Sequence, residues 1–160
     1  LTLEAFAKTP ELELHVCGPV HSEKDFVEAY KKELCDIPNI HVYGRIDVGS
    51  KQFTDIIDRC SAVVYPSGGE GTSGAIGQAM HAGLVPIITH ETGIREDSGY
   101  IALENPTPES VAKAVRDFSN LPEKEVENKS RSIWRFARNL YTRENFSKGY
   151  GRLFDEIMHL

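Results

Sequence analysis

The chain has 160 residues, 40% of them hydrophobic and 26% charged, which is the composition of an ordinary globular domain. Its formal net charge is −6, and this acidity argues against broad nucleic-acid binding, because phosphates are neutralised by clustered cations. Every apolar run falls well short of the roughly 20 residues that a membrane-spanning helix needs, which argues against a transmembrane segment.

The charge is unevenly distributed along the chain. Residues 1–120 contain 10 Lys and Arg against 18 Asp and Glu, whereas residues 121–160 contain 8 against 6. Within the second part, Arg131, Arg135 and Arg138 follow one another at helical spacing. Such a basic helix can touch anionic lipid, but a solvated helix face is the simpler interpretation.

The cysteines and histidines show no metal or disulfide pattern. Cys17, Cys35 and Cys60 are an odd number without a C-x-x-C spacing, which disfavours both a disulfide framework and a zinc site. We expect the cysteines to be buried, reduced thiols in a cytoplasmic protein. The six histidines show no ligand pair, and no metal site is predicted.

Strand and helix patterns alternate through the first part of the chain. Residues 12–16 form a short strand-like run that ends at Gly18 and Pro19 and predicts a strand. Ser22 stands three residues before Asp25, the spacing of a capping box, which predicts a helix through about Leu34. The next strand is predicted at residues 40–43.

The same alternation continues in the middle of the chain. Apolar residues over 53–60 recur at i, i+3, i+4 and i+7, the stripe of an amphipathic helix. Residues 62–65 predict a buried strand, and a helix is expected over about 73–82, with Gly83 just after its end. A further strand is expected at residues 85–89.

The last third of the chain is mainly helical in pattern. After a predicted strand at residues 100–103, Thr107 followed by Pro108 indicates a helix start, and the buried face of that helix should contain Val111, Val115 and Phe118. Residues 122–160 are expected to form the C-terminal helices, with apolar positions at Trp134, Ala137, Leu140, Phe146, Tyr150, Leu153, Phe154 and Ile157.

Short apolar strands that alternate with amphipathic helices predict an α/β fold, a doubly wound parallel sheet with helices on both faces. The chain begins with a helical stripe (Leu3, Phe6 and Ala7), where such domains normally begin with a strand. We therefore expect the first strand, and another domain, to lie upstream. On this interpretation residues 1–160 are a single domain, a fragment of a larger two-domain enzyme.

Ligands of open parallel sheets bind beyond the carboxyl ends of the strands, which makes the loops at 18–22, 44–50, 66–74 and 89–99 the candidates. The third loop is rich in glycine and precedes a predicted helix. Its sequence is Pro66-Ser67-Gly68-Gly69-Glu70-Gly71-Thr72-Ser73-Gly74. A helix start favours phosphate groups, although the loop matches neither an NTPase nor a dinucleotide-binding motif. A simple turn is an equally good interpretation of the glycines alone.

Glu70 makes a ligand site the better interpretation. A carboxylate just beyond a strand is well placed to accept hydrogen bonds from sugar hydroxyls. Gln78, eight residues later and two turns into the predicted helix, can offer a second polar contact. The spacing alone is also compatible with Gln78 as an ordinary surface residue.

The segment from 66 to 86 resembles a known family. The segment contains the pattern Pro66-Ser67-x-x-Glu70-Gly71-x6-Gln78-Ala79-Met80-x-Ala82-Gly83-x-x-Pro86. This pattern is similar to the nucleotide-sugar-binding half of family 4 ("group 1") retaining glycosyltransferases of the GT-B fold. Weaker elements follow in the family's order, at residues 14–18, at residues 42–46 and at Gly93, Glu96 and Gly99.

The resemblance implies a role for several positions. Glu70 matches a carboxylate expected to contact and orient the donor sugar. The loop of Gly71, Thr72, Ser73 and Gly74 should approach that sugar and its diphosphate through its backbone. Gln78 stands where the family has a second Glu, expected to bind the ribose, and it keeps a hydrogen-bonding group without the charge. Gly44 and Arg45 fall where the nucleobase is expected.

The resemblance also implies an activity. The enzyme would move a sugar, with retention, from a nucleoside diphosphate sugar to a glycan or lipid-linked acceptor, as in polysaccharide biosynthesis. No metal or other cofactor is expected. The partner is an N-terminal acceptor-binding domain of the same protein, and this part alone should be inactive. We expect a cytoplasmic protein that could reach the inner face of the cell membrane.

Three alternatives remain open at this point. A nucleotide-sugar epimerase or hydrolase of the same fold would need an acid/base pair, and no His and carboxylate stand at a convincing spacing. A non-catalytic nucleotide-sugar-binding or interaction module with a decayed site gains weight from Gln78. A flavodoxin-like regulatory domain would need an acidic pair and a phosphorylatable Asp, which are not evident.

Overall fold

The computed structural model describes residues 1–159. The strands are β1 (Leu14–Cys17), β2 (Ile40–Gly44), β3 (Ala62–Tyr65), β4 (Val85–Ile88) and β5 (Ile101–Ala102). The α-helices are α1 (Thr2–Ala7), α2 (Lys24–Ala29), α3 (Lys31–Cys35), α4 (Lys51–Ile57), α5 (Gly74–His81), α6 (Pro108–Ser119), α7 (Glu123–Leu140) and α8 (Arg143–Met158). Short 3₁₀ turns lie at Val20–Ser22, His90–Thr92 and Glu96–Ser98.

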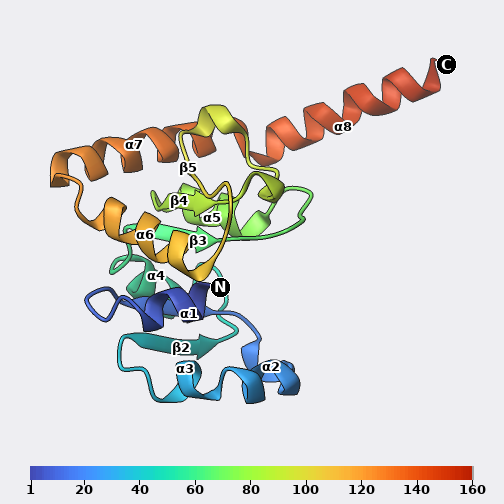
Figure 1. Ribbon diagram of the computed structural model, residues 1–160. Coiled ribbons are helices and arrows are strands. Elements are labelled where there is room, and N and C mark those ends of the chain that lie inside the picture. The colour runs from blue at the N-terminus through green and yellow to red at the C-terminus, as the bar shows by residue number, and fades with distance from the viewer. Residues whose placement is uncertain (160) are drawn as a thin grey trace.

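All strand pairs in the described residues are parallel, which confirms the predicted α/β class with helices against parallel sheets. The strands form two sheets, one of β1 and β2 and one in the order β3-β4-β5. Helices lie on both sides of the strands, and the arrows of β2 and β3 point the same way in Figure 1. The sheet is therefore interrupted between β1 and β3 instead of running through the domain.

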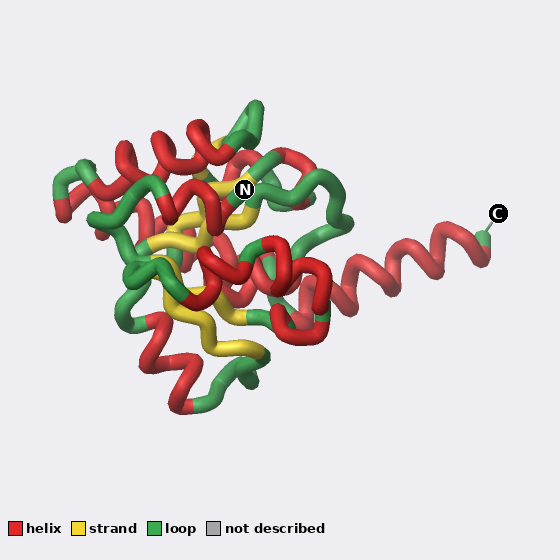
Figure 2. The backbone as a smooth tube through the Cα atoms, turned by 60° about the horizontal axis from the view of Figure 1, so that its bottom comes forward, coloured by secondary structure: helices red, strands yellow, loops and turns green. Residues whose placement is uncertain are grey.

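β4 lies between two apolar clusters, which explains its continuous apolar sequence. Val85 and Ile87 belong to a core with the buried residues of α1 and α6, and Ile88 belongs to a second cluster with Ile76 of α5 and Ile133 of α7. Because both faces of the strand are covered, no polar alternation is seen. Figure 2 shows the strands enclosed by helices.

The predicted element ends at Gly44 and Gly83 and the predicted helix start at Thr107 are confirmed. Gly83 follows α5 with φ +84°, and Gly44 ends β2 with φ +72°, conformations that an L side chain rarely adopts. At the start of α6, the Ser110 backbone N–H donates to Thr107 Oγ1 at 3.2 Å, and the Thr107 N–H donates to Ser110 Oγ at 2.9 Å.

The predicted single helix from Ser22 to Leu34 is wrong. The segment divides into a 3₁₀ turn and the helices α2 and α3, with a break at Tyr30 (φ −111°, ψ 24°). Glu23, not Ser22, precedes α2, and no side chain caps it. The rings of Phe26 and Tyr30 lie 4.9 Å apart and pack against the core, so tertiary packing overrides the local capping pattern.

The expectation of buried cysteines is also wrong for two of the three. Cys17 and Cys35 are exposed, and Cys60 is half-buried; all three thiols are free. Cys17 is the last residue of β1 and Cys35 the last residue of α3, so both lie where an element emerges from the core. Apolar neighbours in sequence do not bury a residue at the end of an element.

The arginine series of α7 lies on a solvated face. Arg131, Arg135 and Arg138 are all exposed. The Arg131 guanidinium pairs with Glu127, and that of Arg138 lies 5.4 Å from the centroid of the Trp134 ring. This agrees with the simpler interpretation of the charge pattern.

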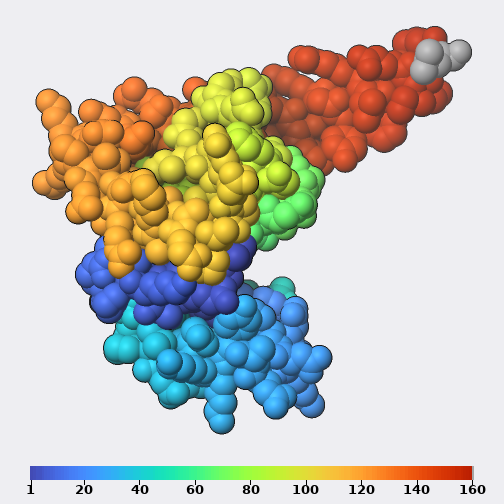
Figure 3. All heavy atoms as spheres, viewed as in Figure 1, coloured from blue at the N-terminus to red at the C-terminus, as the bar shows by residue number. Residues whose placement is uncertain are grey.

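α8 extends away from the rest of the molecule (Figures 1 and 3). It contains no buried residue, and its large apolar side chains are exposed: Phe146, Tyr150, Leu153, Phe154, Ile157 and Met158. Within residues 1–159, no helix combines the length and the apolar character that crossing a membrane requires.

A buried imidazole links β1 and β2. The His15 side chain is 5% exposed, its Nδ1 lies 2.9 Å from Tyr43 Oη, and its ring stacks on that of His41 with centroids 5.1 Å apart. Burial, followed by the nearby His41, lowers the pKa of His15 below the usual 6.5, although the Glu13 carboxylate acts in the opposite direction. The folded protein therefore favours the neutral imidazole.

We expect the free energy of unfolding to fall as the pH decreases through 6.5. Below that pH the unfolded chain binds a proton that the folded state resists, so the stability present above pH 6.5 is progressively lost. His15→Gln should flatten this dependence in urea titrations between pH 7.5 and 5, whereas His21→Gln, at an exposed position, should leave it unchanged. An equally steep dependence in His15→Gln would contradict the assignment.

Candidate functional site

The loops that follow β3 and β4 pack against one another at the carboxyl edge of the sheet. The Glu70 backbone N–H donates to the carbonyl of Glu91 at 2.9 Å, and the Ser73 N–H donates to that of Thr92 at 3.3 Å. Two of the four candidate loops, at residues 66–74 and 89–99, are thus held together by main-chain hydrogen bonds.

Gly93 permits the closest approach between these loops. Its φ is +68°, and a Cβ atom at this position would lie 1.7 Å from the carbonyl oxygen of Gly71. Both the backbone conformation and the space require glycine. Gly93, which matches a glycine of the family pattern, therefore allows the loop that contains Glu70 to pack closely against the loop after β4.

The start of α5 presents backbone N–H groups at the same edge. Ser73 is the N-cap residue, is 5% exposed, and makes no side-chain capping bond. Thr72 and Gly74 beside it are exposed. The first turn of α5 can therefore donate to an anion, where the helix dipole also favours negative charge.

Glu70 is exposed at the tip of the loop and held by a neighbour. Tyr65 Oη, at the end of β3, donates to Glu70 Oε1 at 2.9 Å. This hydrogen bond, followed by partial burial, raises the pKa of Tyr65, so the phenol remains a donor at neutral pH. The bond restricts the position of the carboxylate without removing it from solvent.

The remaining predicted residues lie outside this loop. Gln78 is exposed on α5, one turn beyond Gly74. Gly44 ends β2 in the other sheet, where its carbonyl accepts from the Gly18 N–H at 2.8 Å, and Arg45 follows it with an exposed side chain. The structure thus gathers residues 70–74 at one loop and helix start, and it places Gly44 and Arg45 at the end of a strand in the second sheet.

Sequence reasoning missed the side chains that support the site. The partner of Glu70, Tyr65, carried no signal beyond its place at the end of a predicted strand. Tyr100 Oη lies 2.8 Å from His90 Nδ1 in the loop after β4. His81, interpreted from sequence as a tolerated helix residue, lies with its Nε2 2.8 Å from the Tyr141 carbonyl and so links α5 to the end of α7.

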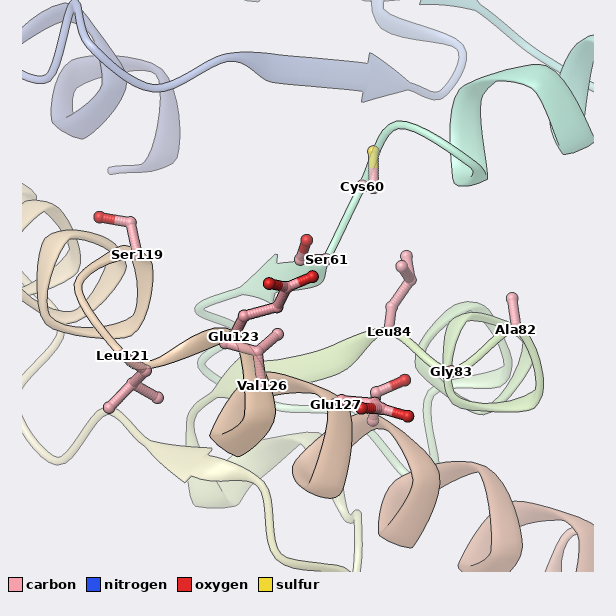
Figure 4. Close-up of a pocket in the computed structure, with 11 residues that line it drawn as sticks. Cys60, Ser61, Ala82, Gly83, Leu84, Ser119, Leu121, Glu123, Val126 and Glu127 are labelled. Carbon is pink, nitrogen blue, oxygen red and sulfur yellow. The ribbon is translucent and has the colours of Figure 1, made fainter.

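A cavity of about 490 Å³ lies at the opposite edge of the sheet (Figure 4). Ser61, which precedes β3, and Leu84, which precedes β4, line it together with Glu123 and Glu127 of α7. None of the site residues predicted from the sequence borders it. The cavity therefore belongs to the amino ends of the strands and not to the loops described above.

A family assignment agrees with this arrangement. Residues 1–120 match the family described as "Glycosyl transferases group 1". The chain belongs to this family of glycosyltransferases.

The structure also resembles a solved one. The C-terminal domain of a glycosyl transferase group 1 family protein (LpcC) from Francisella tularensis superposes with a TM-score of 0.66. The two chains are 18% identical, and the match covers 88% of this chain and 77% of the other. This likeness supports the Rossmann-like half of a GT-B fold. No curated protein matches the sequence.

Proposed function

We propose that this chain is the donor-binding domain of a retaining glycosyltransferase, which transfers a sugar from a nucleoside diphosphate sugar to a hydroxyl of a glycan or lipid-linked acceptor. The observation that carries the proposal is the exposed Glu70 carboxylate next to the uncapped start of α5. An acceptor of sugar hydroxyl bonds and a donor of anion-binding N–H groups thus stand side by side.

Each predicted residue has a role in this proposal. Glu70 orients the donor sugar, and residues 71–74 approach the sugar and diphosphate through their backbone. Gln78 binds the ribose through its amide, and Gly44 with Arg45 borders the base. The reaction is accelerated by positioning and by stabilisation of the departing diphosphate, so no role is assigned to a metal ion.

The proposal includes partners outside this chain. The acceptor site lies on an N-terminal domain of the same protein, which works in the cytoplasm, where it can contact the inner face of the cell membrane. By itself the chain described here binds donor without turning it over.

Calorimetric titration with UDP, GDP and their sugar derivatives tests donor binding directly. One nucleotide series should bind, and Glu70→Ala and Gln78→Ala should each weaken binding of the nucleotide sugar by about tenfold, the effect of losing a hydrogen bond to a bound polar group. Glu125→Ala, at an exposed position of α7, is the matched control. Equal affinity of wild type and Glu70→Ala would contradict the assignment, and failure of the longer protein to bind any nucleotide would favour a decayed module.

Tyr65→Phe should weaken binding of the nucleotide sugar by about three- to tenfold, because one hydrogen bond that holds the Glu70 carboxylate is lost. Affinity for the nucleoside diphosphate without its sugar should not change, since Glu70 contacts only the sugar in this proposal. Tyr150→Phe on the exposed α8 is the control. An equal loss for both ligands would show that Tyr65 acts on the fold and not on Glu70.

A further inference from the structure

Positive charge is concentrated in one stretch of the chain. Residues 128–143 contain five Lys and Arg and no Asp or Glu, whereas the whole chain has a net charge of −6. The remaining residues therefore have a net charge of −11. The basic stretch covers the second half of α7 and the first residue of α8. The domain thus consists of an acidic body with one basic segment.

The basic side chains of α7 face away from the fold. The helix packs on the core through Ile133 and Ala137, which belong to the same buried cluster as residues of α5 and β4. The opposite face contains Arg131, Arg135 and Arg138, and all three are exposed. A face that is solvated in the isolated chain is also one that a negatively charged surface can reach.

Trp134 lies among these arginines. Its side chain is 42% exposed, and the guanidinium of Arg138 lies 5.4 Å from the centroid of its ring. Exposed Trp next to Arg is typical of helices that lie at a membrane surface, where the ring enters the headgroup region and the cations meet phosphates. Nucleic acid is disfavoured as the anionic partner because the rest of the domain is acidic. The pattern therefore favours an anionic lipid bilayer.

The end of α7 is attached to the elements of the candidate site. The Tyr141 carbonyl lies 2.8 Å from Nε2 of His81 at the end of α5, and the Arg95 N–H donates to Tyr141 Oη at 3.5 Å. Arg95 belongs to the loop after β4, which packs against the loop that contains Glu70. The basic segment therefore ends beside the loop on which the site is built.

We propose that the outer face of α7, with Arg131, Trp134, Arg135 and Arg138, and the adjoining Arg143 dock on an anionic lipid bilayer. The arginines contact headgroup phosphates, and Trp134 enters the interface between headgroups and water. The acidic body is repelled by the same surface, so the two effects together orient the domain. The proposal rests on the membrane contact included in the proposed function, and it assigns that contact to this domain.

The exposed apolar side chains of α8 are a separate feature. Residues 144–158 contain two Lys and Arg against three Asp and Glu, a net charge of −1. This part of α8 therefore gives no preference for anionic over neutral lipid. Lipid charge separates a contact made by α7 from one made by α8.

Trp134 is the single tryptophan of the chain, so its fluorescence reports from within the proposed face. The chain is titrated with vesicles of phosphatidylcholine alone and with vesicles that contain equal amounts of phosphatidylcholine and phosphatidylglycerol. We expect the emission of Trp134 to shift to shorter wavelength on the anionic vesicles only. Added salt should reverse this shift, because it screens the attraction between the arginines and the headgroups.

A charge reversal on α7 tests the residues. Arg135→Glu combined with Arg138→Glu should weaken binding to the anionic vesicles by about tenfold or more. Lys31→Glu combined with Lys32→Glu is the matched control, since it changes the net charge equally at exposed positions of α3. This helix lies on the opposite side of the molecule from α7 (Figure 1), so the control should bind nearly as the wild type does. Far-UV circular dichroism shows whether both variants are folded.

Four results would overturn the proposal. An equal loss in both charge variants would mean that only the total charge matters. Binding without a shift of the Trp134 emission, or binding that is lost in Phe146→Ser with Phe154→Ser and kept in the arginine variant, would assign the contact to α8. A shift that appears without vesicles as the protein concentration rises would assign the face to a second copy of the chain.

The fourth result is the absence of any shift on the anionic vesicles. Titration of the same protein with nucleotide sugar then separates this proposal from the proposed function, because binding to vesicles requires no nucleotide. Intact nucleotide binding without vesicle binding would overturn the membrane contact alone. Vesicle binding without nucleotide binding would support the contact of α7 and count against the donor site.

Discussion

Gly93→Ala should lower the free energy of unfolding by about 3 kcal/mol or more, because two penalties fall on one residue. The left-handed backbone (φ +68°) is unfavourable for alanine, and the new Cβ would lie 1.7 Å from the carbonyl oxygen of Gly71. Neither backbone segment can yield without breaking the hydrogen bonds that join the loops at Glu70 and Ser73. Urea denaturation followed by circular dichroism measures the change.

Gly99→Ala is the matched control for this substitution. Gly99 has a similar φ of +83° but no atom within 4 Å of the position of a Cβ. Its replacement should therefore cost only the conformational penalty, about 1 kcal/mol. If both variants lose the same stability, the contact between Gly93 and Gly71 contributes nothing, and the two loops are held by other interactions.

Asn39→Ala should lower the free energy of unfolding by about 2–3 kcal/mol. The Asn39 side chain is buried, and its Nδ2 donates to the carbonyls of Phe6, Thr9 and Leu12 at 3.0, 3.1 and 2.7 Å. It thereby ties the segment between α1 and β1 to the start of β2.

The expected cost of Asn39→Ala stays below the sum of three lost hydrogen bonds, since two of the carbonyls keep a backbone partner. The Phe6 carbonyl also accepts from the Thr9 N–H, and the Thr9 carbonyl accepts from the Leu12 N–H. Asn128→Ala, at an exposed site of α7, should change stability by less than about 0.5 kcal/mol. A similar small effect of Asn39→Ala would show that the connection before β1 does not need this amide.

Local patterns were sufficient where an element is defined by its own residues. The apolar run of β4, the helix start at Thr107 and Pro108 and the glycine after α5 were all predicted and are confirmed. In each case the interactions span only a few residues, so the sequence contains the whole cause. The fold class follows from the same alternation of strands and helices.

Predictions failed where contacts between distant parts of the chain decide the outcome. The helix expected from Ser22 is divided because Phe26 and Tyr30 pack into a core built by other elements. Cys17 and Cys35 are exposed because their elements end there, which their apolar neighbours do not reveal.

The sequence by itself determined the α/β class, the glycine-rich loop with Glu70 and the helix that follows it, since these depend on hydrophobic periodicity and on backbone preferences of single residues. Only the tertiary structure decided that this loop packs against the backbone of Gly93 and that Tyr65 donates a hydrogen bond to Glu70. The division of the parallel sheet between β1 and β3 is also a feature of the tertiary structure alone. These features are made by hydrogen bonds and close contacts whose geometry depends on how the chain folds, so hydrophobic periodicity and residue preferences do not specify them.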